Sequence, residues 1–235
     1  MSGYIGNAPT AVPLTSADIA DGIITSAKIA DGTIVNADIN ASAAIDASKL
    51  SGVTSDFVLL ATTTASSSAS ISFDGYFSAT YKNYVVILSD VFPASSSGFL
   101  RIRLRKSNTD ITTSNYLYGG SGQFQHTGVD SGFKYYGTGS NDTVIRTMEE
   151  SGTVNTSNYA YNQKIHIYNP LATNTYKIIT QEIGLVKRAS ETNYVMSLIA
   201  GSGVLNDNTN AISGISFFMS TGNIASGNFK LYGIK

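Results

Sequence analysis

Apolar and polar residues alternate along much of the chain from residue 54 to the C-terminus. The clearest alternation spans residues 100–105, where arginines separate Leu100, Ile102 and Leu104. Because successive side chains of a strand point to opposite faces, this period of two predicts a strand whose three apolar residues face a core. Shorter alternations at 70–74 and 164–168 predict two more strands of the same kind.

Continuous apolar runs at 84–88, 176–179 and 215–219 are typical of central strands, and residues 227–235 are expected to form the last strand. Gly, Ser and Asn residues separate these segments, and no convincing amphipathic helix interrupts them. About eight or more short strands in such a series predict an all-β fold. We therefore expect residues 54–235, the head, to form an antiparallel, jelly-roll-like β-sandwich.

Residues 14–53, the arm, are repetitive. Residues that favour helix N-caps recur at ten-residue spacing, at Ser16, Ser26, Asn36 and Asp46. A glycine follows in three of these units, where a helical turn would need a left-handed residue. We therefore favour a unit of ten residues, with a helical turn, a glycine stop and a short extended piece. A five-residue period, as in a pentapeptide solenoid, is the competing interpretation, but its register slips after Ile39.

One large aliphatic residue in about every five cannot close a core within an arm of this length. The apolar stripe therefore needs partners, and identical copies around a symmetry axis are the simplest ones. A flexible linker is the alternative, but linkers do not place isoleucine at fixed intervals. The residues expected to make the contacts between copies are Ile19, Ile24, Ile29, Ile34, Ile39 and Leu50.

Residues 1–13 contain glycines and prolines and have no core of their own. Such a terminus is ordered only when a partner holds it, so we expect Tyr4 and Ile5 to attach this segment to another protein. The segment lacks the basic and apolar regions of a signal peptide, and the chain has no apolar run of about 18 residues. We therefore expect no membrane insertion.

Charged residues make up 13% of the chain, about half of what is usual for soluble domains, and the formal net charge is -1. The polar surface must come from Ser, Thr, Asn and Gly, which suits extracellular β-proteins and virion fibres better than a cytosolic helical enzyme. Nothing in this charge balance suggests a nucleic-acid partner. With no Cys and only two His, we expect neither a metal site nor a cofactor. The Gly-rich segments 118–123 and 137–142 are incomplete as a hydrolase motif and as a dinucleotide-binding loop, so we expect turns there and no enzymatic activity.

Residues 116–136 combine aromatic rings with glycines. Flat rings with polar edges suit sugar rings, and glycines permit loops that could present them. The candidates for contact with a surface glycan are Tyr116, Tyr118, Tyr135 and Tyr136. The alternative is that these rings belong to the core or to a contact between subunits.

Two segments carry a resemblance to a known family. Leu-Thr-Ser-Ala-Asp-Ile at 14–19 and Ala-Lys-Ile-Ala-Asp-Gly-Thr-Ile at 27–34 resemble N-terminal repeats of tail-fibre and virion structural proteins of marine and cyanobacterial bacteriophages. Residues 226–235 look like the closing strand of the β-sandwich heads of such proteins. Together the matching segments cover a small part of the chain.

The resemblance implies a homotrimeric fibre that is part of the virion. The composition of an exposed protein, without an export signal, fits a chain that is made in the host cytoplasm. Its N-terminus would attach to another virion protein and its head would bind the host, as in a tail-fibre-type receptor-binding protein. The alternative is a capsid decoration protein or head fibre that stabilises the shell or gives weak adhesion.

Overall fold

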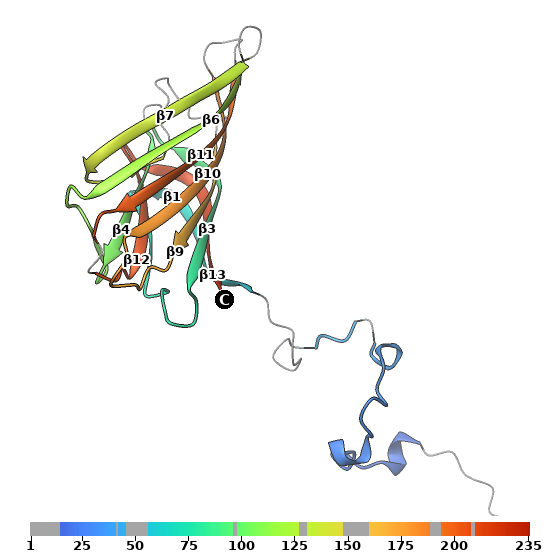
Figure 1. The fold of residues 1–235 in the computed structure, drawn as a ribbon. Helices are drawn as coiled ribbons and strands as arrows, with labels where there is room; N and C mark the ends of the chain where they lie inside the picture. Colours follow the sequence, from blue (N-terminus) through green and yellow to red (C-terminus); the bar gives the residue numbers. More distant parts are fainter. Residues whose placement is uncertain are drawn as a thin grey trace, which may run out of the picture. The chain divides into compact units, whose positions relative to one another are not determined.

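The computed structural model describes residues 15–40, 42–45, 56–95, 98–126, 131–147, 160–188, 194–207 and 210–235. The chain divides into two compact units, Met1–Thr54 and Ser55–Lys235, and every described strand belongs to the second (Figure 1). All the strand pairs are antiparallel, which confirms the all-β prediction for the head.

The arm repeats one local structure every ten residues. Its three 3-10 turns are η1 (Ser16–Asp18), η2 (Ser26–Lys28) and η3 (Asn36–Asp38). Gly22 and Gly32 follow the first two turns, and both have a φ of +77°, the left-handed region that favours glycine. The ten-residue period is confirmed over the described part of the arm, and the five-residue interpretation is wrong there. The predicted glycine stop is also wrong, because Ile19 and Ile29 end the first two turns in an extended conformation. Gly22 and Gly32 instead lie in separate turns, closed by bonds from the Ile23 N–H to the Ala20 carbonyl and from the Thr33 N–H to the Ala30 carbonyl. Residues 46–53, including Leu50, lie outside the described residues.

The N-caps of these turns lie one residue earlier than the sequence predicts. Ser16 is the first residue of η1, and Thr15, in an extended conformation, is its cap. The carboxylate of Asp18 accepts hydrogen bonds from the backbone N–H of Thr15 at 2.8 Å and from its hydroxyl at 2.7 Å. The side chain of the third residue therefore stabilises the turn. The Asp38 carboxylate accepts the equivalent bond from the backbone N–H of Val35 at 2.9 Å.

The head contains a large and a small sheet (Figure 1). The large sheet has the order β1 (Phe57–Ser68), β13 (Ile224–Ile234), β3 (Asn83–Pro93), β9 (Tyr161–Tyr168), β10 (Lys177–Arg188), β11 (Tyr194–Leu205), β6 (Tyr116–His126) and β7 (Ser131–Asp142). The small sheet has the order β2 (Ser70–Asp74), β12 (Gly214–Met219), β4 (Leu100–Lys106) and β5 (Thr109–Asp110), with β8 (Ile145–Arg146) also paired to β4.

The inner faces of the two sheets share one hydrophobic core, as in a β-sandwich. Phe217 of β12 lies with its ring centroid 6.5 Å from that of Phe73 on β2 and 5.4 Å from that of Phe229 on β13. The alternating apolar residues of β4 are fully buried in this core, as the sequence predicts: Leu100, Ile102 and Leu104. The core therefore joins strands that are far apart in the sequence.

Candidate functional site

Tyr116, a candidate for glycan contact, is a core residue. Its side chain on β6 is 0% exposed, and its hydroxyl accepts a hydrogen bond from the Leu104 N–H at 3.0 Å and donates one to the Ile111 carbonyl at 3.1 Å. Burial raises the pKa of Tyr116 above its ordinary value. The glycan interpretation is wrong for this residue, because both the ring and the hydroxyl are used inside the head.

Tyr118 lies two residues further along β6 and is half-buried. Its ring covers Gly139 of the neighbouring strand β7, where an added Cβ would lie 2.3 Å from the ring. Its hydroxyl donates a hydrogen bond to the Asp142 carboxylate at 3.2 Å, and the Arg146 guanidinium lies 5.8 Å from the ring centroid. Intramolecular contacts thus use one face of the ring and the hydroxyl.

The other two candidates lie on β7, where Tyr135 is paired with Ser121 and Tyr136 with Gly120. Their side chains lie outside the described residues, so their role in glycan contact stays a prediction. The structure therefore brings segment 116–136 together as one hairpin, β6–β7, rather than as a set of irregular loops.

The arginines of β4 are the most concentrated positive charges of the described head, but they are already paired. Arg105 forms ion pairs with Asp74, at 2.9 Å, and with Asp110. Arg103 lies over the ring of Phe218, at 4.5 Å from its centroid, and donates a hydrogen bond to a backbone carbonyl at 3.1 Å. Since Arg101 is only 8% exposed, this outer face of the small sheet is neither fully solvated nor open to an anion.

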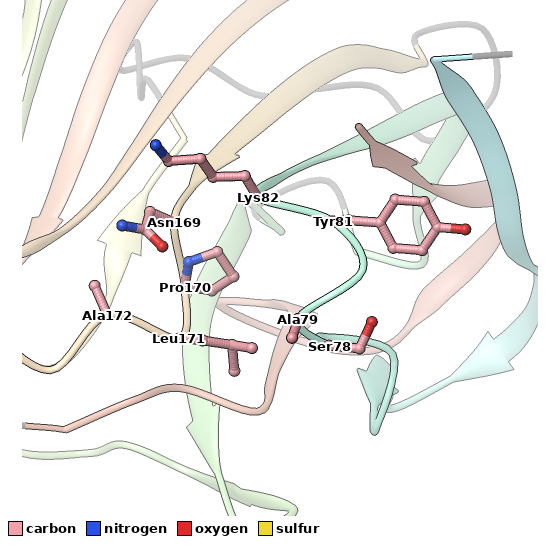
Figure 2. Close-up of a pocket in the computed structure, with 8 residues that line it drawn as sticks. All are labelled: Ser78, Ala79, Tyr81, Lys82, Asn169, Pro170, Leu171 and Ala172. Atoms are coloured by element: carbon pink, nitrogen blue, oxygen red, sulfur yellow. The ribbon is translucent and has the colours of Figure 1, made fainter. Parts of the chain in front are cut away.

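A shallow cavity of about 390 Å³ lies between two loops of the head that the sequence analysis did not single out (Figure 2). One loop joins β2 to β3 and contributes Ser78, Tyr81 and Lys82. The other joins β9 to β10 and contributes Asn169 and a short apolar segment at 170–172. The only sequence signal for this cavity is the Asn169-Pro170 turn, which predicts a loop but not its neighbour.

The walls of this cavity are held by hydrogen bonds within the head. The Tyr84 hydroxyl accepts from the Ser78 N–H at 2.7 Å and donates to the Ser78 carbonyl at 3.1 Å. The Asn169 N–H donates to the Lys82 carbonyl at 3.0 Å, which ties the two loops together. The cavity combines the ammonium of Lys82, the amide of Asn169 and the apolar side chains of 170–172. This combination suits weak binding of a small polar molecule such as a sugar unit.

The described residues hold no group of three or more His, Cys, Asp or Glu that could bind a metal ion. Within the same part of the chain, no helix is long and apolar enough to cross a membrane. Comparisons with models of known families, with curated proteins and with solved structures found no match. Function must therefore be inferred from the surfaces of the chain itself.

The contrast between Tyr116 and Tyr118 generates a prediction about stability. Tyr116→Phe leaves the buried Leu104 N–H without its acceptor, so we expect it to lower the free energy of unfolding by about 1–3 kcal/mol. Tyr118→Phe is the matched control and should cost less, because its side chain is only half-buried and the Asp142 carboxylate keeps its bonds from the Thr143 N–H and from Arg146. Urea denaturation of both variants measures the difference, and equal losses would contradict the core assignment of Tyr116.

Proposed function

We propose that this protein is a non-enzymatic structural protein of a bacteriophage virion, of the tail-fibre receptor-binding type. Its N-terminal segment attaches to another virion protein, its arm associates with the arms of identical chains, and its head faces the host. The resemblance of the arm and of the last strand to phage virion proteins supports the assignment to a virion.

The observation that carries the proposal is the exposure of the arm's isoleucines. In a single chain, the exposed fractions of the described large aliphatic residues of the arm lie between 38% and 54%, for Ile19, Ile23, Ile24, Ile29, Ile34, Val35, Ile39 and Ile45. A repeated backbone with a regular apolar stripe and no core of its own supports association between chains. A closed ring of three identical chains is the arrangement we propose, following the resemblance to trimeric fibres.

We also propose that the head is a jelly roll. The strands β1, β2, β3 and β4 alternate between the two sheets in chain order. The last two strands then insert among them, which gives β1-β13-β3-β9 in the large sheet and β2-β12-β4 with β8 in the small one. This interleaving of two Greek keys supports the jelly-roll assignment. The strands β10, β11, β6 and β7 extend the large sheet beyond it.

Adhesion is the proposed role of the head, and weak contacts suffice for it. Several heads on one particle bind a surface together, so each needs only a shallow site. The cavity between the loops at 78–82 and 169–172 fits this requirement, and so does the prediction for Tyr135 and Tyr136. A capsid decoration protein or head fibre remains the second candidate, since the same arm and head would serve it equally well.

Association through the arm predicts the mass of the purified protein in solution. The full-length protein should give the mass of about three chains in light scattering, whereas Ile29→Asp combined with Ile34→Asp should give the mass of one. The reason is that charge in the buried stripe of the oligomer is strongly unfavourable.

A matched control adds the same two charges at polar positions of the same repeat. Ser26→Asp combined with Thr33→Asp should leave the oligomer intact, because neither residue belongs to the apolar stripe. A monomeric wild-type protein at micromolar concentration would refute the arm's role.

The proposed attachment through residues 1–13 leads to a second prediction. Residues 1–14 lie outside the described residues, so the assignment of Tyr4 and Ile5 rests on the sequence. A variant without residues 2–13 should remain a folded oligomer and should fail to enter virions. Quantification of the protein in purified particles tests this, and normal incorporation would exclude the attachment role. The copy number of the wild type separates a tail fibre, with few copies, from a decoration protein, with many.

A further inference from the structure

The outer face of the large sheet carries an exposed apolar belt near one end. The belt follows a single line of paired residues across the strands: Phe57, Ile234, Asn83, Tyr168, Ile178, Val204 and Leu117. Asn83 is its only strongly polar residue. The exposed fractions of Phe57, Ile178 and Leu117 are 43%, 43% and 39%. An outward face of an antiparallel sheet is ordinarily polar, so this line of residues calls for an explanation.

The next line of paired residues widens the belt. It does so only over its first four residues, which are Leu59, Tyr232, Val85 and His166. Leu59 is 52% exposed, whereas Val85 is already buried within the chain. The line continues with polar Thr180 and Ser202. The Phe57 and Tyr232 rings are in contact, with centroids 5.0 Å apart. The His166 ring lies against the Tyr168 ring, with centroids 4.7 Å apart, and burial lowers the pKa of His166, which favours its neutral form. The belt therefore carries no charge at neutral pH.

The belt ends where charged residues begin. The following line contains Lys230, Ile87, Lys164 and Glu182, and the Lys164 ammonium lies 3.5 Å from the Glu182 carboxylate. Both of these side chains are well exposed, as is expected of a solvated sheet face. The continuous apolar line is thus confined to one end of the face, and further along the sheet an exposed apolar residue such as Leu198 stands beside Gly184 and Gln123.

The first described residues of the head lie at this end of the sheet. Phe57 is the first residue of β1, and the backbone N–H of Lys235 donates to the Asp56 carbonyl at 3.2 Å, which fixes the entry point beside the C-terminus. About a dozen residues separate Ile45 from Phe57, so the connection spans at most about 40 Å. When arms associate, the belts of the associated copies are therefore confined to a small shared volume.

The size of the belt indicates which partner can cover it. Strands about 4.8 Å apart, one full line of side chains and the first part of a second line give at most roughly 350 Å² per copy. A stable interface between free proteins buries about 800 Å² per partner, so the belt is too small to hold an untethered partner. A partner that is already tethered needs far less contact, because its effective concentration reaches the millimolar range.

We propose that the belt is the contact surface between heads of the same oligomer, covered by the head of a second copy of this chain. The inference rests on the proposed association through the arm. It adds that the heads are held together side by side rather than moving independently at the ends of their arms. The belt is uncharged and apolar, as is expected of the centre of an interface between identical subunits.

The chain has no cysteine, so a single introduced thiol is the only one that can be labelled, and this proposal can be tested in that way. Ile178→Cys places a thiol in the belt, and Leu198→Cys places one on the same sheet face outside it, where the side chain is 66% exposed. In the full-length oligomer we expect a maleimide to label Cys at 178 about tenfold more slowly than Cys at 198, because a covered thiol is inaccessible. Thermal melts of both variants check that the head is folded.

The same labelling in the background of Ile29→Asp and Ile34→Asp identifies what covers the belt. The two thiols should then react within about twofold of one another, since no second copy is held nearby. Equal rates in the intact oligomer would overturn the belt proposal and leave the arm's role standing. Slow labelling at 178 in the monomeric background would overturn it too, because the chain itself would then cover the belt. A wild-type monomer in light scattering would instead refute the arm's association.

Discussion

Burial of apolar surface between two antiparallel sheets is the interaction on which the head depends. Rings from three strands that are distant in the sequence, Phe73, Phe217 and Phe229, meet at the centre of this core. No disulfide is available to hold the fold, because the chain has no cysteine. The stability of the head therefore comes from packing, which a sandwich of this size supplies on its own.

Within one chain, the apolar surfaces of the arm and of the outer belt are not buried in this way. The arm places isoleucines at regular intervals on turns that leave them exposed, and the belt places Phe57, Leu59 and Ile178 on a sheet face that should be polar. Association through the arm and contact between heads would bury both surfaces with one symmetric assembly. The proposed oligomer would therefore bury two apolar surfaces that a single chain leaves exposed.

Local patterns in the sequence predicted local structure well. The alternation at Leu100, Ile102 and Leu104 identified a strand and its buried face, and the ten-residue spacing with Gly22 and Gly32 identified the unit of the arm. The predicted N-cap position was wrong by one residue. Thr15 is the cap, and the Asp18 carboxylate within the turn accepts a hydrogen bond from its N–H. Tyr116 was misjudged because its burial depends on β4, whose position relative to β6 is set by tertiary packing. The belt could not be predicted, since only strand register brings Phe57 beside Ile234.

Amide hydrogen exchange of the full-length protein is the most direct test of the proposed association of identical chains through the arm. The first two turns are each closed by two local backbone bonds, in the second turn from the Lys28 N–H to the Thr25 carbonyl at 2.9 Å and from the Ile29 N–H to the Ser26 carbonyl at 3.2 Å. In an isolated chain these amides exchange almost as fast as in an unfolded peptide, because local structure without tertiary contacts gives little protection. The account predicts slowing of at least about a hundredfold at Lys28 and its equivalents in the oligomer. Exchange at the unprotected rate throughout residues 16–38 would contradict it.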